Sequence, residues 1–272
     1  AIVADPAFPI HVYGVALAGG NVISVPLGND QAFLDRIAMV CEHLYPRPKL
    51  LILNYPHNPT AMTVEPGFFE TVVDLARRFE IAVIHDFAYG ETAFDGYRPP
   101  SFLSTPGAKD VGVEFTTMSK PYGMAGFRIG FAAGNPEMLN ALATIKGYYD
   151  YGIFQPIQIA SIIAMRHCDQ DIVAQNEKYQ RRRDVVCDGL RRIGWEVDVP
   201  RASMFVWTRV APEHIGDRGS IEYAMDLLHG ANVAIAPGRA FGENGENCMR
   251  IALVENEHRL RQAMRNISRF VQ

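Results

Sequence analysis

Lys120 stands in a segment suited to binding an anion. The segment runs from Thr117 to Arg128 with the sequence TMSKPYGMAGFR, and it includes the hydroxyl of Ser119. Hydroxyl groups and a guanidinium donate the hydrogen bonds that a phosphate accepts. The other four of the chain's five lysines are interpreted as solvated surface charges, the usual state of a lysine. The first hypothesis is therefore a phosphate site around Lys120.

Polar residues also follow the ends of other predicted strands. The apolar runs 50–53 and 81–84 predict buried strands, followed by Asn58 and Asp86, and a third predicted strand, 111–117, runs into Lys120. A fourth strand is predicted over 128–132. In open α/β sheets, ligands bind outside the carboxyl ends of the strands. We therefore expect these polar side chains to share one crevice.

The order of elements predicts an α/β fold with a mostly parallel sheet covered by helices. Between the first two strands, apolar residues from Phe69 to Phe79 follow a helical period. We predict a large domain over 1–170, then a connecting helix from Asp169 to about Arg192. The helix opens a smaller α+β domain over 171–272, with strands at 204–207, 233–235 and 250–253 and a final amphipathic helix.

Composition excludes several classes of protein. The chain has 272 residues, of which 48% are apolar, and its net charge of −4 offers no basic excess for nucleic acid. No apolar run approaches the roughly 20 residues of a membrane span. Eight scattered histidines and four separated cysteines show no metal-ligand spacing, so we expect no metal, free thiols and a cytoplasmic location. The cysteines are Cys41, Cys168, Cys187 and Cys248.

Three ordered motifs carry a family resemblance. They are S-K-x-x-x-x-x-G-x-R from Ser119 to Arg128, Asn58-Pro59-Thr60 and Asp86-Phe87-Ala88-Tyr89. The chain resembles the class I/II aminotransferases among the fold-type I pyridoxal-phosphate (PLP) enzymes, over essentially its whole length to the segment around Arg250. The resemblance implies a three-layer α/β/α architecture, PLP as cofactor and a homodimer with active sites at the subunit interface.

The resemblance also implies catalytic roles. Lys120 would hold PLP as a Schiff base and move the proton between the substrate Cα and the cofactor. Asp86 would keep the pyridine nitrogen protonated, although a helix N-cap is the alternative for that residue alone. Asn58 and Tyr89 would hydrogen-bond the phenolic oxygen. Lys120, Asp86 and Tyr89 are thus the predicted catalytic residues.

Further residues would bind the cofactor. Arg128 would hold the phosphate together with the hydroxyls of Thr117 and Ser119. Phe8 falls where the family places an aromatic ring against the face of PLP. In this family a glycine- and hydroxyl-bearing loop and a tyrosine from the other subunit precede that ring, but only seven residues precede Phe8 here. We expect that the chain lacks the N-terminal segment of a longer enzyme; the alternative is a truncated chain that has lost part of its pocket.

The resemblance places the substrate at Arg250, which would grip its α-carboxylate with help from Asn58. The segments around these residues look most like the alanine (glutamate/pyruvate) and LL-diaminopimelate branch. This implies transamination of an alanine-type amino acid with a 2-oxo acid such as 2-oxoglutarate. A PLP-dependent C–S lyase on the same scaffold and a non-catalytic PLP-fold module remain the alternatives.

Overall fold

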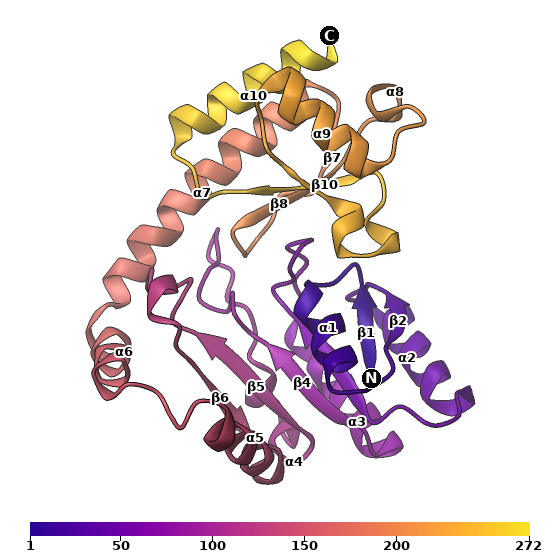
Figure 1. The fold of residues 1–272 in the computed structure, drawn as a ribbon, viewed down its shortest axis with the longest axis vertical. Helices are drawn as coiled ribbons and strands as arrows, with labels where there is room; N and C mark the ends of the chain where they lie inside the picture. Colours follow the sequence, from indigo (N-terminus) through magenta and orange to yellow (C-terminus); the bar gives the residue numbers. More distant parts are fainter.

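The computed structural model describes residues 1–272, which form two sheets (Figure 1). The large sheet has the order β2-β1-β3-β4-β5-β6, and all of its pairings are parallel except that of β5 with β6. The predicted mostly parallel α/β sheet is confirmed. Its strands are β1 (Ile2–Asp5), β2 (Ile23–Pro26), β3 (Leu50–Asn54), β4 (Ala82–Asp86), β5 (Gly112–Thr117) and β6 (Gly130–Gly134).

Both faces of the central strands are apolar, because parallel strands are covered on each side. Successive side chains alternate between the faces, so Leu51 and Val83 pack with Phe69 on one side. Ile52 packs with Val15 on the other side. The helices of this part are α1 (Pro9–Leu17), α2 (Gln31–His43), α3 (Pro66–Phe79), α4 (Ala108–Val111), α5 (Pro136–Tyr149) and α6 (Gln155–His167).

The long polar helix is α7 (Asp169–Arg192), with the predicted bounds. A four-stranded antiparallel sheet of order β7-β8-β10-β9 follows it and surrounds a second core. The sheets lie before and after α7 in the sequence, and the division at residue 170 stays a prediction. The later elements are β7 (Glu196–Val197), β8 (Phe205–Arg209), α8 (Pro212–Ile215), α9 (Ser220–Ala231), β9 (Ala236–Pro237), β10 (Cys248–Ala252) and α10 (Glu257–Val271).

Two predicted strands begin too early in the sequence. Arg128 has φ 51° and ψ 49°, in the left-handed region, at the end of the 3₁₀ turn Ala125–Phe127, so β6 starts only at Gly130. The strand predicted over 233–235 is wrong at these positions: Asn232 ends α9 with φ 53°, and the chain pairs with β10 only from Ala236, where the short strand β9 begins. Local apolar character did not reveal either left-handed residue.

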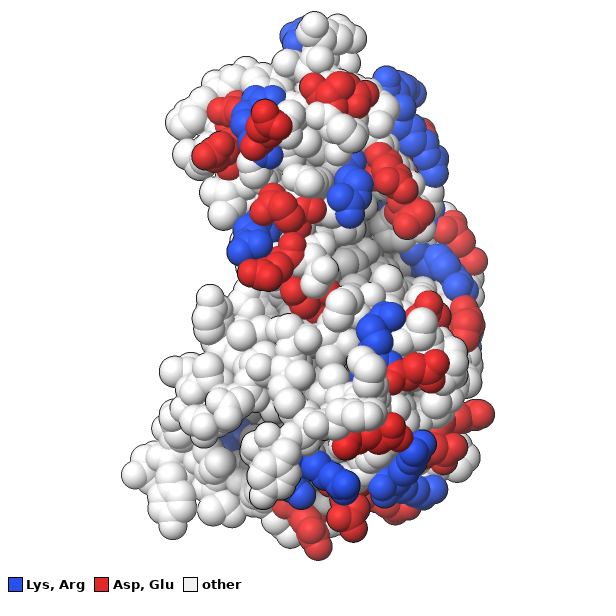
Figure 2. Space-filling view, turned by 90° about the vertical axis from the view of Figure 1, so that its right-hand side faces the viewer, with Lys and Arg blue, Asp and Glu red and all other residues white.

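None of the helices has the length and apolar character needed to cross a membrane. The four cysteines are all free thiols. No group of three or more His, Cys, Asp or Glu side chains is arranged to hold a metal ion. In the space-filling view an indentation separates the upper, smaller part of the molecule from the lower, larger part (Figure 2).

A buried arginine joins the two parts. Arg183 of α7 has a side chain only 4% exposed and donates hydrogen bonds to Asp95, in the loop after β4, and at 3.0 Å to the carbonyl of Pro200. Its guanidinium also lies 5.1 Å from the ring centroid of Phe94. The Phe94 amide donates at 2.8 Å to the carbonyl of Arg201. The loop that follows Asp86 is thereby fastened to the small sheet and to α7.

Replacing Arg183 should loosen this connection. In Arg183→Met the apolar stem remains, but the buried Pro200 carbonyl loses its donor, so we expect the free energy of unfolding to fall by about 2 kcal/mol. Denaturant titration measures the change. Arg181→Ala is the matched control, since Arg181 is exposed on the same helix and its loss should cost about 0.5 kcal/mol or less. Equal effects of the two substitutions would contradict a special role for Arg183.

Candidate active site

The register of the large sheet brings the predicted site residues to one edge. Asn54 at the end of β3 pairs with Asp86 at the end of β4, and Asp86 pairs with Phe115 of β5. These strands are parallel, so their carboxyl ends adjoin. The loop with Asn58 and the turn with Lys120 follow β3 and β5 at that edge. The sheet topology therefore brings the segments that follow β3, β4 and β5 to one edge, and the shared crevice stays a prediction.

The turn between β5 and β6 carries the predicted phosphate ligands. Because β6 is antiparallel to β5, Arg128 just before it lies at the same edge, where it is exposed and donates at 3.1 Å to the carbonyl of Ala125. The hydroxyl of Thr117 donates at 3.3 Å to the carbonyl of Ile129 and accepts from the amide of Ser119 at 3.0 Å. The Thr117 hydroxyl thus stabilises the turn itself.

Asp86 is held by a histidine that sequence analysis left among the scattered ones. His11 of α1 is buried, and its Nε2 lies 3.0 Å from Asp86 Oδ2, while Oδ1 accepts from the amide of Ala88 at 3.1 Å. No helix begins directly after β4, since the next helical segment starts only at Phe102, so the alternative of a helix N-cap at Asp86 is wrong. His11 also lies edge-on to Phe8, with ring centroids 5.8 Å apart. Its position one helical turn after Phe8 was the available signal.

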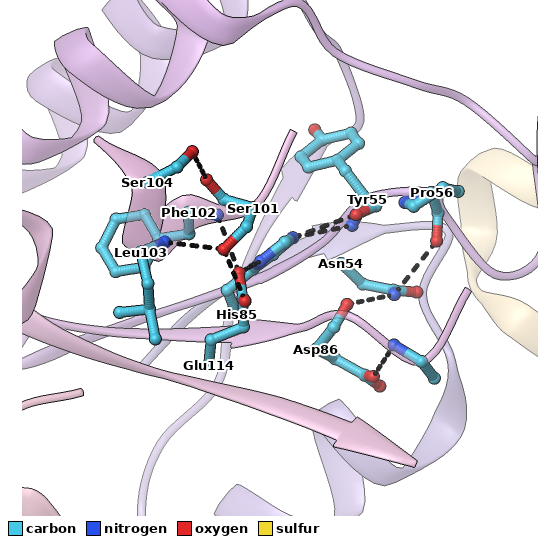
Figure 3. A network of polar contacts seen from close by, with 11 residues as sticks. Asn54, Tyr55, Pro56, His85, Asp86, Ser101, Phe102, Leu103, Ser104 and Glu114 are labelled. Carbon is cyan, nitrogen blue, oxygen red and sulfur yellow. Dashed lines mark hydrogen bonds and ion pairs between the residues drawn. The ribbon is translucent and has the colours of Figure 1, made fainter. Parts of the chain in front are cut away.

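Asn54 is a second residue that sequence analysis missed. Its Nδ2 donates to the carbonyls of Asp86 at 2.7 Å and of Pro56 at 3.2 Å (Figure 3). Its Oδ1 accepts from the amide of Asn58 at 2.8 Å. One buried amide therefore holds the Asn58 loop against the end of β4. Every polar atom of this side chain is used within the protein.

A buried pair supports the site from within the sheet. His85 is fully buried, and its Nδ1 lies 2.9 Å from Glu114 Oε2, while its Nε2 faces the backbone of Tyr55 (Figure 3). Glu114 also accepts hydrogen bonds from the Ser101 hydroxyl and the Phe102 amide, both at 2.7 Å. Burial alone would raise the pKa of Glu114, but these hydrogen bonds hold that pKa below its ordinary value.

Arg250 of β10 completes the site from the small sheet. Its Nη1 donates at 2.7 Å to Asn58 Oδ1, and its Nε is buried without a partner. The guanidinium lies over the rings of Phe205, at 4.3 Å, and Phe241, at 4.5 Å. Tyr89, which is buried, packs edge-on against Phe205 with centroids 5.6 Å apart. Burial lowers the pKa of Arg250, whose charge no Asp or Glu side chain balances.

The sequence of the chain matches a known protein family. The family model for aminotransferase class I and II matches residues 1–267. The chain belongs to this aminotransferase family. It is 48% identical over 269 residues to the glutamate-pyruvate aminotransferase AlaC of Escherichia coli (strain K12), a match that covers 98% of this chain and 64% of the relative. The chain therefore spans less than two thirds of the length of that relative.

Other aminotransferases match over nearly the whole chain. The LL-diaminopimelate aminotransferase of Halothermothrix orenii (strain H 168) is 39% identical, with 98% of this chain and 68% of the relative covered. The solved structure of a probable N-succinyldiaminopimelate aminotransferase from Thermus thermophilus superposes with a TM-score of 0.89 at 30% identity. That match covers 99% of this chain and 71% of the other. The three names specify different substrates, so substrate choice differs among the relatives of this chain.

Members of this aminotransferase family depend on PLP, and the donor set at the sheet edge fits that cofactor. The cofactor offers a phosphate, a phenolic oxygen and a basic ring nitrogen, which require cations, hydrogen-bond donors and a carboxylate. Lys120 and Arg128 form no ion pair with an acidic side chain, and Asp86 offers a partly exposed carboxylate. The structure directly joins Asn58 to Arg250, but no hydrogen bond or ion pair links Lys120 or Arg128 to the other predicted site residues.

The ion pair of Glu114 with His85 should make the stability of the protein depend on pH. Because the folded pKa of Glu114 lies below the unfolded value of about 4.3, its stabilisation is complete above that value and is lost as the pH falls through the folded pKa. We expect Glu114→Gln to be less stable than the parent at pH 7 and the difference to shrink toward pH 3. Urea titrations at several pH values measure it. A difference that is constant with pH would contradict the assignment.

Proposed function

We propose that the protein transfers an amino group between an L-amino acid of the alanine type and a 2-oxo acid such as 2-oxoglutarate, with PLP as cofactor. One observation carries this proposal: the partly buried guanidinium of Arg250 has no carboxylate partner in the protein and is joined to Asn58 across the two sheets. A partly desolvated guanidinium without a counter-ion is less stable than a paired one, and a ligand carboxylate would supply the missing charge. The planar guanidinium matches the two oxygens of an α-carboxylate.

PLP supplies an electron-withdrawing ring that makes the Cα proton of an amino acid acidic. The protein's residues position and move protons. Lys120 follows β5, the neighbour of β4 in the sheet, and its amine would serve as the base at Cα. Asp86 would offer its carboxylate to the ring nitrogen, with His11 holding one oxygen in place. Asn58 and Tyr89 would hydrogen-bond the phenolic oxygen, and Arg128 with Ser119 would hold the phosphate.

The preferred amino acid is proposed from the sequence similarity to AlaC. Among the relatives, AlaC is named for glutamate and pyruvate, and it shares 48% of the aligned residues. Because Arg250 and Asn58 contact only the α-carboxylate that all amino acids share, these two residues leave the side-chain preference open. A ping-pong cycle between two acids follows from one site serving both half-reactions in turn.

Lys120→Ala tests the reaction. The full-length parent with PLP should convert alanine and 2-oxoglutarate into pyruvate and glutamate, and its visible cofactor band should change on adding alanine. We expect Lys120→Ala to lose at least about 100-fold in kcat, because the proton-transfer group is gone. Lys178→Ala is the matched control, since Lys178 is exposed on α7 and forms no ion pair.

Each other outcome has a meaning. Release of ammonia in place of glutamate would indicate elimination, the activity of a lyase on the same scaffold. If the parent shows neither a cofactor band nor turnover with any amino acid, the protein is the non-catalytic module of the alternative interpretation. Full activity in Lys120→Ala would overturn the assignment of the base.

We also propose that the protein forms a homodimer through α5 and α6. Helix α5 has no buried residue, and α6 has only two, Ser161 and Ala164. Apolar side chains on these helices are nevertheless exposed, among them Ile145 at 60% and Ile163 at 53%. Exposed apolar surface of this extent is typical of an interface.

The double variant Ile145→Glu/Ile163→Glu tests the interface. Burying two carboxylates in an apolar contact is unfavourable, so we expect the parent to have the mass of a dimer and the variant that of a monomer by light scattering. Val254→Glu, at an exposed apolar position in the small domain, should leave the mass unchanged. A variant that stays dimeric with unchanged affinity would exclude this face. A cytoplasmic location remains part of the proposal, and the free thiols favour it.

A further inference from the structure

The loop between β9 and β10 touches the end of β1. This loop, Gly238–Gly245, consists of two 3₁₀ turns, Gly238–Phe241 and Glu243–Gly245. The side-chain amide of Asn244 donates at 2.8 Å to Asp5 Oδ2. The amide of Ala7 donates at 2.8 Å to the carbonyl of Phe241. A loop of the small sheet is thus bound to the segment that leads from β1 to Phe8.

At Gly242 the loop lies too close to Asp5 for any residue with a Cβ. Gly242 has φ 140°, a conformation that L-residues other than glycine rarely adopt, and a Cβ built on it would lie 1.7 Å from Asp5 Oδ1. Asp5 is only 9% exposed, and this Oδ1 is buried without a hydrogen-bond partner. A buried carboxylate oxygen in that state costs free energy and calls for an explanation.

The same loop supplies part of the surroundings of Arg250. The Arg250 guanidinium lies 4.5 Å from the ring centroid of Phe241, whose carbonyl binds Ala7. Phe241 also packs edge-on against Trp207, with centroids 6.2 Å apart. Cation–π contact with aromatic rings restricts where a guanidinium can lie. The position of Phe241 therefore affects how Arg250 presents its donors.

We propose that Asp5 is a positioning residue for Arg250. Its carboxylate holds the loop Gly238–Gly245, and the loop holds the Phe241 ring against the guanidinium. Because Asp5 lies three residues before Phe8, the carboxylate-binding arginine is then aligned to the segment that carries the predicted stacking ring. This inference rests on the proposed function only in taking the ligand of Arg250 to be a carboxylate.

Kinetics of five variants of the full-length protein test the proposal. We expect Asp5→Ala and Phe241→Leu each to raise the KM for alanine roughly three- to tenfold, the size of a lost cation–π contact, with kcat changed about twofold or less. Asp5→Asn should stay near the parent, because an amide oxygen still accepts from Asn244. The double variant should resemble either single variant, because Asp5 acts through Phe241. Glu243→Gln, an exposed carboxylate in the same loop, should change nothing.

Binding without turnover provides an independent measurement. Trp207 beside Phe241 should change its fluorescence when propionate, an unreactive carboxylate, binds Arg250, and Trp207→Phe serves as the blank. The propionate dissociation constant should rise in Asp5→Ala by the same factor as KM. This titration needs no reaction, so a parent that binds propionate but does not transaminate would separate failure of the proposed function from failure of this inference.

Several results would overturn the inference. They are additive effects of the Asp5 and Phe241 substitutions, a fall in kcat with KM and propionate binding unchanged, or an Asp5→Asn variant as impaired as Asp5→Ala. A parent that binds no propionate would overturn both this inference and the assignment of Arg250.

Discussion

The hydrogen bond between Arg250 and Asn58 is the interaction on which the site depends, because it joins two sheets built from distant parts of the chain. A guanidinium keeps its charge when buried and must find acceptors. Here the protein provides one amide oxygen and two aromatic rings but no carboxylate. The other guanidinium donors have no partner within the protein, which is the basis of the proposed carboxylate site; a carboxylate is the group that every amino acid and 2-oxo acid carries.

Contacts within the large sheet hold Asn58 in the position that its hydrogen bond with Arg250 requires. Asn58 must stay where Arg250 reaches it, and Asn54 holds the Asn58 amide and the Asp86 carbonyl together. His85 links the strand ends, because its ring contacts Glu114 of β5 on one side and the backbone of Tyr55, just after β3, on the other (Figure 3). Polar groups that are buried in this way are stable only when fully paired, so the network also fixes one arrangement of the loops.

Two other contacts hold the small sheet, which carries Arg250, against the large part of the molecule. Arg183 fastens α7 to the loop after β4, and the loop Gly238–Gly245 meets β1 at Asp5. Both contacts lie between segments that are far apart in sequence. Together they hold the aromatic rings around Arg250 in a fixed relation to the large sheet.

Sequence patterns correctly predicted the mostly parallel α/β sheet and the bounds of α7, and they identified Asn58, Asp86, Lys120 and Arg250 as candidate site residues. Apolar runs, helical periods and family motifs are all local features of the chain, so they can be recognised without coordinates. Which residues meet depends instead on the folded chain. His11 reaches Asp86 across 75 positions, and Arg250 reaches Asn58 across 192. No local period carries contacts of that separation, because they arise only when strand order and loop packing are set.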